Sequence, residues 1–372
     1  MESQRSITDL PFDVLDLIFK ELESLIDKLQ LAQAHEKLGK AFSYHSRSAY
    51  KCLYPFAGIR PELWMVLVKE CGSTIVEFSS NKVESTNWSD QLAKSIVLHC
   101  PNMKAVKIHV YEDNCDSVQS FLLNMSNALT SVELVIFTND SKKIFDSVAK
   151  MINITKLILR GDITEEVYQI QKLVALEELE IVSYKRFSPY MPLNLLEICA
   201  PLTNLRCLTV LNITIMPSEK QHSMVWTVLA HLKINNCEIF TELPHCPSLK
   251  DLDMINTKCH VKGLLLGFIL QNGINLEKMN EKGKPPPFDG DGFLQVLRSC
   301  PKLRTFYTPM QDIKIYQSYV SSIVEILKEN GVQQEEPFRL IIYARPKSKW
   351  LRRLIPRTSN PELIALDYLY NF

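Results

Sequence analysis

Residues 10–42 read LPFDVLDLIFKELESLIDKLQLAQAHEKLGKAF, and apolar side chains recur along this stretch at helical spacing. A first helix is predicted from Pro11, with Asp9 as its cap, and its apolar face comprises Val14, Leu15, Ile18, Phe19 and Leu22. Asp27 is expected to open a second short helix, and a third is expected to begin near Glu36. A segment shorter than about 40 residues rarely buries enough surface to be stable alone. We therefore expect the apolar face of these helices to need a partner.

The order and spacing of these residues resemble the F-box, the three-helix module that docks cullin-based ubiquitin ligases. The matching positions are Leu10-Pro11, Val14-Leu15, Ile18-Phe19, Leu22, Asp27-Lys28-Leu29 and Leu31-Ala32. The resemblance implies contacts with a Skp-family adaptor by eight residues: Leu10, Pro11, Leu15, Ile18, Phe19, Leu22, Leu29 and Leu38. The third helix departs from the family, because His35 and Leu38 stand where many F-boxes have Cys and Trp. The alternative is a plain amphipathic helical cap on a larger fold.

The rest of the chain repeats one pattern, in which an apolar residue is followed three and five positions later by two more. Complete copies are Met103/Val106/Ile108, Leu129/Val132/Leu134, Ile154/Leu157/Leu159, Leu176/Leu179/Ile181, Leu205/Leu208/Val210, Leu229/Leu232/Ile234 and Leu249/Leu252/Met254. Two later copies, Leu276/Met279 and Leu303/Phe306, lose the last apolar residue to Glu281 and Thr308, and Val76/Phe78 is a degenerate first copy. From Val76 to Phe306 the middle positions run in nine steps, so the mean period is about 26 residues.

Alternation within each copy predicts a short strand, and helical patterns such as 118–125 and 144–151 lie between the copies. One strand and one helix cannot bury an apolar face alone, so stacked copies are expected to share a core. The pattern resembles a leucine-rich-repeat horseshoe, with strands on the concave side. It is irregular, because only Cys237 matches the Asn or Cys that such repeats usually place after the last core residue. A general βα protein with coincidental leucines is the alternative.

The expected fold class is therefore α/β, with an N-terminal three-helix F-box followed by an irregular leucine-rich-repeat solenoid. The expected domains are residues 1–53 for the F-box, 54–72 for a linker and capping helix, and 73–372 for the solenoid with a C-terminal cap. Strand character at 338–343 and 363–368 indicates closing repeats. The whole chain thus resembles an insect-type F-box/leucine-rich-repeat receptor.

Composition narrows the function classes. Lys plus Arg and Asp plus Glu are 42 each, and this balance argues against a nucleic-acid partner. The sequence shows neither an apolar run long enough to span a membrane nor the N-terminal pattern of a secretory signal, so we expect a cytoplasmic or nuclear protein without a membrane partner. The ten cysteines include no Cys-x-x-Cys pair, which predicts neither a metal site nor a cofactor, and Cys100, Cys246 and Cys300 precede prolines as repeat punctuation.

A search for catalytic motifs finds no nucleophile elbow, phosphate loop or dinucleotide fingerprint, so no enzyme activity is expected. Candidate target-binding residues are those predicted on the concave strand face: Lys107, His109, Glu133, Arg160, Glu180, Lys233, Asp253 and Tyr307. A basic segment at 345–357 with Trp350 could grip an acidic or phosphorylated partner, or form a solvated loop with its tryptophan packed inward.

The expected function is substrate recognition in an SCF-type ubiquitin ligase. The adaptor connects the chain to a cullin, while the repeats bind a target protein that the sequence does not name. The alternatives are a scaffold that binds the adaptor outside ubiquitin transfer, and a repeat-type inhibitor or structural protein without an adaptor. An enzyme is the third alternative for the function of this chain.

Overall fold

The computed structural model describes residues 6–55, 58–80, 88–138, 140–184, 190–218, 225–282, 288–310, 313–343 and 345–369. The chain forms two compact units, Met1–Leu173 and Val174–Phe372. Each unit is described separately below.

Three helices form at the N-terminus where the sequence predicts them: α1 (Phe12–Glu21), α2 (Leu25–Ala34) and α3 (Glu36–Ser46). The start of α2 differs, because the hydroxyl of Ser24 accepts from the backbone N–H of Ile26 at 3.2 Å and begins the helix two residues before Asp27. Asp9 does not cap α1. Its carboxylate instead accepts from the backbone N–H of Ser6 at 2.8 Å and closes the short 3-10 turn η1 (Ile7–Asp9).

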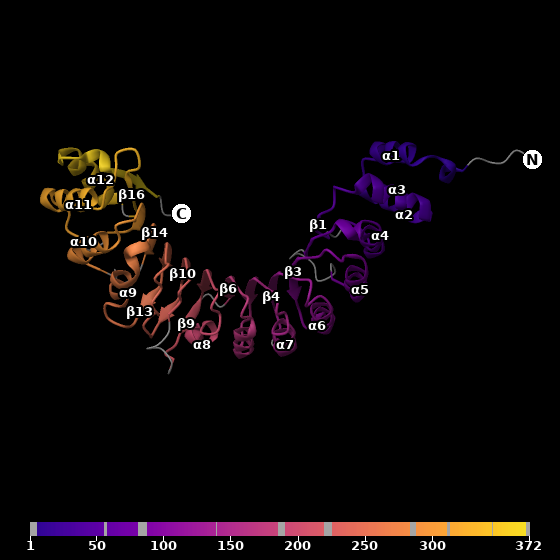
Figure 1. Ribbon diagram of the computed structural model, residues 1–372, viewed down its shortest axis with the longest axis horizontal. Helices are drawn as coiled ribbons and strands as arrows, with labels where there is room; N and C mark the ends of the chain where they lie inside the picture. Colours follow the sequence, from indigo (N-terminus) through magenta and orange to yellow (C-terminus); the bar gives the residue numbers. More distant parts are fainter. Residues whose placement is uncertain are drawn as a thin grey trace, which may run out of the picture. The chain divides into compact units, whose positions relative to one another are not determined.

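The remainder of the first unit alternates strands and helices. Its strands are β1 (Cys52–Leu53), β2 (Glu77–Ser79), β3 (Ala105–Val110), β4 (Ser131–Ile136) and β5 (Lys156–Gly161), and they pair in parallel in chain order. Its helices are α4 (Pro61–Cys71), η2 (Gly72–Thr74), α5 (Asp90–His99), α6 (Cys115–Asn124), α7 (Lys142–Val148) and the 3-10 helix η4 (Glu165–Lys172). Helices α5, α6 and α7 cover one face of these strands, as Figure 1 shows.

The register of the first unit places equivalent residues of each repeat side by side. Phe78 pairs with Val106, Val106 with Val132, and Val132 with Leu157, and all four side chains are buried. The predicted repeat therefore forms a continuous apolar core. The ladder also begins earlier than the sequence suggested, because β1 lies within the segment 1–53 that was assigned to the helical module.

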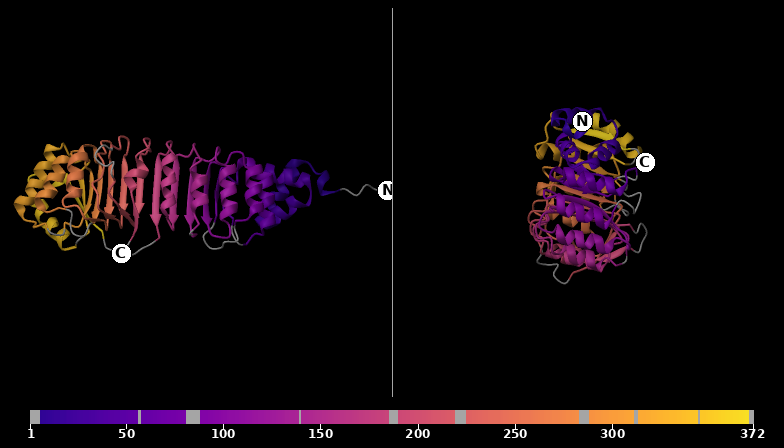
Figure 2. Two further views of the ribbon diagram at one scale, coloured as in Figure 1. Left: turned by 90° about the horizontal axis from the view of Figure 1, so that it is seen from below. Right: turned by 90° about the vertical axis from the view of Figure 1, so that its right-hand side faces the viewer.

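The second unit carries more strands of the main sheet than the first, and Figure 2 (left) shows these strands side by side. Its parallel strands follow chain order: β6 (Glu178–Ser183), β8 (Cys207–Leu211), β10 (His231–Asn235), β12 (Asp251–Ile255), β14 (Lys278–Lys282), β15 (Thr305–Thr308), β16 (Phe338–Ile342) and β17 (Ile364–Tyr368). Its helices are α8 (Leu195–Cys199), α9 (Leu264–Asn272), η6 (Gly273–Asn275), α10 (Gly290–Ser299), α11 (Gln317–Glu329), α12 (Arg345–Leu354), η7 (Ile355–Arg357) and η8 (Pro361–Leu363). Strands β16 and β17 confirm the two closing repeats.

A second parallel sheet, absent from the sequence-based prediction, forms from β7 (Met191–Leu193), β9 (Ile213–Ile215), β11 (Glu238–Ile239) and β13 (Lys258–Cys259). Three of these short strands follow an asparagine in the left-handed region: Asn212, Asn236 and Asn256, with φ of 58°, 51° and 53°. Asparagine tolerates this conformation better than other residues with a β-carbon. The shared turn carries the chain from one sheet to the other in three consecutive repeats.

The residues after these asparagines bond the previous repeat. The hydroxyl of Thr257 donates to the carbonyl of Ile234 at 2.6 Å, and the thiol of Cys237 donates to the carbonyl of Val210 at 3.6 Å. Thr257 therefore takes the role that the sequence assigned to Cys237 alone, and the turns of these repeats are more regular than predicted.

Residues 289–292 start helix α10, and the carboxylate of Asp289 accepts from the backbone N–H of Gly292 at 2.9 Å. The preceding residues 283–287 lie outside the described part of the chain. The basic segment at 345–357 forms α12 and η7 instead of a loop, and Trp350 is exposed.

The two units share one construction. Parallel strands carry the Leu-x-x-Leu-x-Leu pattern in register. Short helices follow most of these strands, and the short strands β9, β11 and β13 follow β8, β10 and β12. Each unit is thus a segment of an α/β leucine-rich-repeat solenoid.

Candidate functional site

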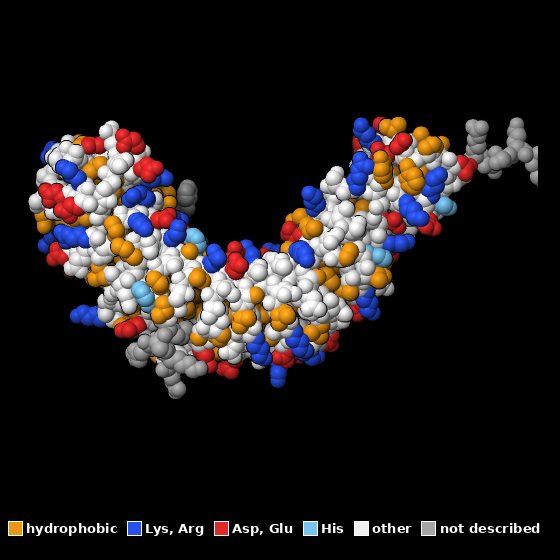
Figure 3. Space-filling view, viewed as in Figure 1, with side chains coloured by type: hydrophobic (Ala, Val, Ile, Leu, Met, Phe, Trp, Pro, Cys, Tyr) orange, Lys and Arg blue, Asp and Glu red, His pale blue; other side chains and the backbone are white. Residues whose placement is uncertain are grey.

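Helix α1 has two apolar faces with different surroundings. Leu15 and Phe19 point into the packing of α1 against α3, where Phe19 lies 5.6 Å from the ring of Phe42. Val14 and Leu17 lie on the other side, with 39 and 58% of their surface exposed. Phe12, at the start of the helix, is 41% exposed and its ring lies 6.5 Å from that of Tyr44 on α3. Hydrophobic side chains are accordingly visible at the surface of the N-terminal helices in Figure 3.

The eight predicted adaptor-binding residues divide between these surroundings. Pro11 is exposed, and Leu10, Ile18 and Leu22 are half-buried. Buried in the interior of the helices are Leu15, Phe19, Leu29 and Leu38. These four have almost no surface to offer a partner in this structure and act as core residues. Sequence spacing alone missed Phe12 and Leu17, although both are visible as apolar residues between the matched positions.

A polar link that the sequence did not indicate joins the same three helices. The His45 ring lies 2.8 Å from a carboxylate oxygen of Asp16 on α1 and 3.2 Å from the ammonium of Lys28 on α2. The ring also stacks on Phe19 at 5.8 Å. His45 therefore fixes the relative positions of the helices that carry the exposed apolar residues.

The strand face of the first unit carries a charged cluster. The carboxylate of Glu133 lies 2.7 Å from the ammonium of Lys107 and 3.6 Å from the guanidinium of Arg160. All three were predicted as target-binding residues, and the structure brings them together across β3, β4 and β5. The cluster presents charges of both signs on the strand face.

His109, the fourth candidate in this unit, has a different position. Only 5% of its surface is exposed, and its ring lies 3.0 Å from the hydroxyl of Ser80 and stacks against Phe137. The Ser80 hydroxyl also accepts from the backbone N–H of His109 at 2.9 Å. His109 thus links the chain after β2 to β3 and offers little surface for a target.

The four candidates of the second unit share one row of the sheet. Through the strand pairing, Glu180, Thr209, Lys233, Asp253, Asn280 and Tyr307 lie side by side on consecutive strands. The Lys233 ammonium is 4.0 Å from Asp253. Burial raises the pKa of the Asp253 carboxyl, and the positive charge of Lys233 partly opposes this shift.

The row ends in an aromatic group that the sequence-based selection missed. The Tyr343 hydroxyl donates to the side-chain oxygen of Asn280 at 2.8 Å, its ring lies 6.5 Å from that of Tyr307, and the ammonium of Lys282 lies 5.1 Å from its centroid. Asn280 was omitted because it is uncharged, although it shares the strand position of Asp253 and Tyr307. Acidic, amide, aromatic and cationic groups together suit a polar protein ligand.

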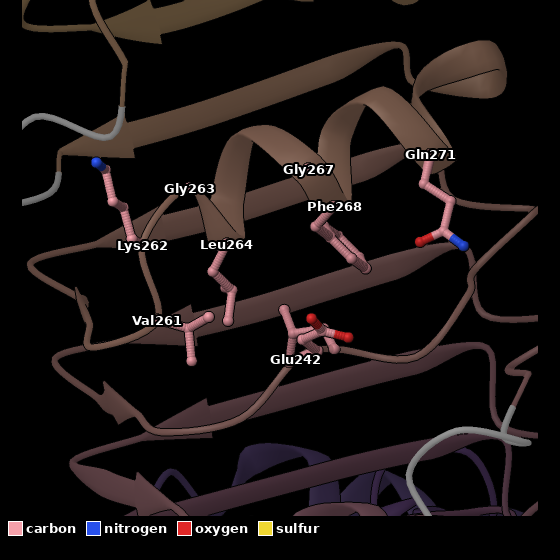
Figure 4. A pocket seen from close by; sticks show the side chains of 9 residues that line it. Glu242, Val261, Lys262, Gly263, Leu264, Gly267, Phe268 and Gln271 are labelled. Carbon is pink, nitrogen blue, oxygen red and sulfur yellow. The ribbon is translucent and has the colours of Figure 1, made fainter.

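Two hollows lie on the helical side of the repeats. A cavity of about 260 Å³ lies beside α9, and Leu264 and Phe268 from that helix point toward Glu242 while the Lys262 ammonium points away (Figure 4). A groove of about 670 Å³ between α5 and α6 is lined by Ala93, Val97, Leu98 and Phe121 together with polar residues. Both linings mix apolar side chains with polar and charged ones.

Cysteine and metal chemistry were also considered. All ten cysteines are free, and burial raises the pKa of Cys71, Cys100, Cys237, Cys246 and Cys300 to about 12. Such thiols are protonated near neutral pH and are poor nucleophiles or ligands. Among the described residues, no group of three or more His, Cys, Asp or Glu side chains is arranged to hold a metal ion. Within the same residues, no helix combines the length and apolarity needed to cross a bilayer.

No family model matches the sequence. No curated protein matches it either. Similar solved structures include the TLR13–ssRNA13 complex, at a TM-score of 0.44 and 12% identity over 85% of this chain and 40% of that one.

Two Arabidopsis receptor kinases are also similar. HAESA, solved with the peptide hormone IDA and the co-receptor SERK1, gives a TM-score of 0.38 and 12% identity over 79% of this chain and 49% of that one. The LRR ectodomain of GASSHO1/SCHENGEN3, solved with CASPARIAN STRIP INTEGRITY FACTOR 2, gives 0.38 and 12% over 81% and 45%. The chain spans less than half the length of each of the three. At these TM-scores the likeness carries no argument, and the fold assignment rests on the strand register described above.

Proposed function

We propose that this protein is the substrate-recognition subunit of an SCF-type ubiquitin ligase. In this proposal α1–α3 bind a Skp-family adaptor, the adaptor connects the chain to a cullin, and the repeats bind a target protein. The chain itself makes and breaks no covalent bond and needs no cofactor. It accelerates ubiquitin transfer by holding the target near the transferring enzyme, which raises the effective concentration of the target. Its proposed compartment is the cytoplasm or nucleus.

The observation that carries this proposal is the exposed apolar surface of α1. A helix that buries Leu15 and Phe19 within its own unit, yet leaves Val14 and Leu17 largely exposed on its other side, has a second apolar surface that a partner can cover. Burial of such a face against another chain is favourable by about 25 cal/mol per Å². The exposed apolar side chains of α1 are therefore more stable in an apolar groove of the adaptor than in water.

The exposure of each side chain divides the proposed contact residues into two groups. Direct contacts are assigned to Leu10, Pro11, Ile18 and Leu22, joined by Phe12, Val14 and Leu17. The buried residues Leu15, Phe19, Leu29 and Leu38 support the helices from within. The Asp16–His45–Lys28 link holds the three helices in the same arrangement.

The strand faces are the proposed target-binding surfaces. In the first unit the Lys107–Glu133–Arg160 cluster presents mixed charge. In the second unit the row from Glu180 to Tyr307, extended by Tyr343, presents acidic and aromatic groups. Such surfaces favour specific polar contacts with a protein.

Co-expression of the full chain with a Skp-family adaptor and a cullin tests the proposal. We expect the three proteins to elute together in size-exclusion chromatography. Leu22→Asp should release the adaptor, because a carboxylate buried without a partner in an apolar seam costs several kcal/mol. A wild-type chain that elutes alone, or a Leu22→Asp chain that elutes with the adaptor like the wild type, would overturn the proposal.

The second candidate is a leucine-rich-repeat scaffold or inhibitor without a role in ubiquitin transfer. The burial of four of the eight residues first assigned to the adaptor favours it, because a self-sufficient helical cap would also bury them. The two functions are separated by a reconstituted ubiquitylation assay on proteins captured by the repeats. Ubiquitin chains on a captured protein support the receptor, and capture without modification supports the scaffold.

A further inference from the structure

The helix α12 and the following turn η7 carry an unusual concentration of positive charge. Between residues 345 and 357 there are six basic residues and no acidic one. Exposed among them are Lys349, Arg352, Arg353 and Arg357, and the side chain of none of these forms an ion pair or hydrogen bond with another described residue. Lys347 differs, because its ammonium donates to the carbonyl of Ile313.

This absence of partners contrasts with the strands of the same unit. Lys250 lies 3.2 Å from Glu277, Lys278 lies 3.5 Å from Asp251, and Arg339 lies 3.2 Å from Asp367. Asp367, on the strand β17 against which α12 packs, is thus already paired with another cation. The cations of α12 remain available to a ligand.

An aromatic side chain lies among these cations. Trp350 has 55% of its surface exposed, whereas Trp64, Trp88 and Trp226 are buried. The opposite side anchors the segment, because Ser348 and Leu351 of α12 and Ile355 of η7 are buried in the unit. The core therefore fixes the helix in an orientation that exposes the tryptophan and the unpaired cations.

We propose that the exposed face of α12 and η7, formed by Lys349, Trp350, Arg352, Arg353 and Arg357, binds an acidic peptide segment of a protein partner. Its carboxylates pair with the guanidinium and ammonium groups, and an aliphatic side chain of the peptide packs on the Trp350 ring. This surface is distinct from the adaptor-binding helices and from the strand faces, so it adds a docking site to the proposed function.

The arrangement favours an extended acidic segment over a single phosphate group. Residues 349–357 would span about 12 Å at the rise of a helix, and their cations follow the convex surface of a helix instead of converging on one point. A phosphate site normally collects bidentate arginines and backbone N–H groups around one anion.

The same observations disfavour a membrane or a nucleic acid. A membrane-surface helix inserts several large apolar side chains, whereas α12 buries Leu351 in its own unit and exposes a single tryptophan. Nucleic-acid binding normally draws on a broad excess of cations, and this chain has equal numbers of acidic and basic residues.

The test uses the full-length chain and a fluorescein-labelled peptide of about 12 glutamates with one central leucine, a length that covers the surface when extended. Fluorescence anisotropy should show saturable binding that weakens as salt is raised from about 0.05 M to 0.5 M. The double reversal Arg352→Glu/Arg353→Glu should weaken it about tenfold or more, because it replaces two attractions by two repulsions. Trp350 emission should change on binding, and this change should be absent in Trp350→Phe.

The matched control is Arg298→Glu/Lys328→Glu, which makes the same charge change at exposed positions of α10 and α11. Equal weakening by both double variants would overturn the proposal, as would an absence of peptide binding. Tighter binding to phosphatidylserine vesicles, to a duplex DNA or to a peptide with one phosphoserine would also overturn it in favour of that ligand. Because no adaptor is present in the assay, failure here is distinguishable from failure of the proposed ligase function.

Discussion

The hydroxyl of Thr308 donates a hydrogen bond of 2.6 Å to the carboxylate of Glu281, and both residues are buried in the second unit. These are the two positions at which consecutive repeats lose the last apolar residue of the pattern. The loss is therefore compensated within the core, because each polar side chain supplies the partner of the other.

Thr308→Val should destabilise the protein by about 1–3 kcal/mol, because it leaves a buried acceptor without this donor. Glu281→Leu alone should also destabilise the protein, since the Thr308 hydroxyl then loses the carboxylate to which it donates. The double variant Glu281→Leu/Thr308→Val restores the apolar pattern of the neighbouring repeats and should be more stable than the sum of the single changes. Urea unfolding of the four proteins measures this coupling. Additive effects would show that the two residues act independently.

Asn256→Val should destabilise the second unit by about 1–2 kcal/mol, because a β-branched residue is strained at a φ of 53°. Asn256→Gly should be close to neutral, since glycine adopts this conformation readily. Thermal unfolding of both variants tests the shared turn. Equal loss of stability in the two would mean that the asparagine side chain, and not its backbone conformation, matters.

Gly273→Ala and Gly267→Ala should have opposite effects although the residues lie six apart. A β-carbon at residue 273 would come within 2.4 Å of the sulfur of Cys300, whereas one at residue 267 meets no atom within 4 Å. Gly273→Ala should therefore cost about 1–3 kcal/mol of stability, and Gly267→Ala in α9 should add about 0.5–1 kcal/mol.

The contact with the sulfur can be tested separately. Combining Gly273→Ala with Cys300→Ala should recover part of the lost stability in urea unfolding, because the clashing atom is removed. A Gly273→Ala chain as stable as the wild type would contradict the close approach of these two repeats.

Asp253→Asn should stabilise the protein at neutral pH. Burial raises the pKa of this carboxyl in the folded state above its ordinary value of about 3.9 in an unfolded chain. The folded state then binds the proton more tightly, so the stability contributed by this group falls as pH rises through the window between the two pKa values. The gain from Asp253→Asn should be present at pH 7 and smaller at pH 3. A gain that does not depend on pH would contradict this account.

The repeats were predictable because their signal is geometric. The middle apolar position of successive copies is occupied by Leu179, Leu208, Leu232 and Leu252. The structure pairs these residues in chain order across β6, β8, β10 and β12. The second sheet was missed, although Asn212, Asn236 and Asn256 each lie four residues after the middle leucine. This regularity was overlooked because the expected asparagine position was one residue further along.

The candidate sites were less predictable, because the spacing of residues in the sequence does not show which side chains are buried. Leu15 and Leu17 are both apolar and two residues apart, yet the first is in the core and the second is on the surface. His109 and Arg160 share the predicted strand face, but neighbouring side chains cover only the histidine. The alternative in which Trp350 packs inward from a loop is wrong, because the segment is helical and the period of α12 assigns the inner face to Ser348 and Leu351.

The most direct measurement is the affinity of the purified full chain for a Skp-family adaptor, compared between Leu17→Asp and Ile274→Asp. Both side chains are 58% exposed, on α1 and in the second unit respectively, so the two substitutions disturb folding to a similar small degree. The account predicts that Leu17→Asp abolishes the heat of binding in isothermal titration while Ile274→Asp binds like the wild type. Binding that is unchanged by Leu17→Asp, or lost equally in both variants, would contradict it.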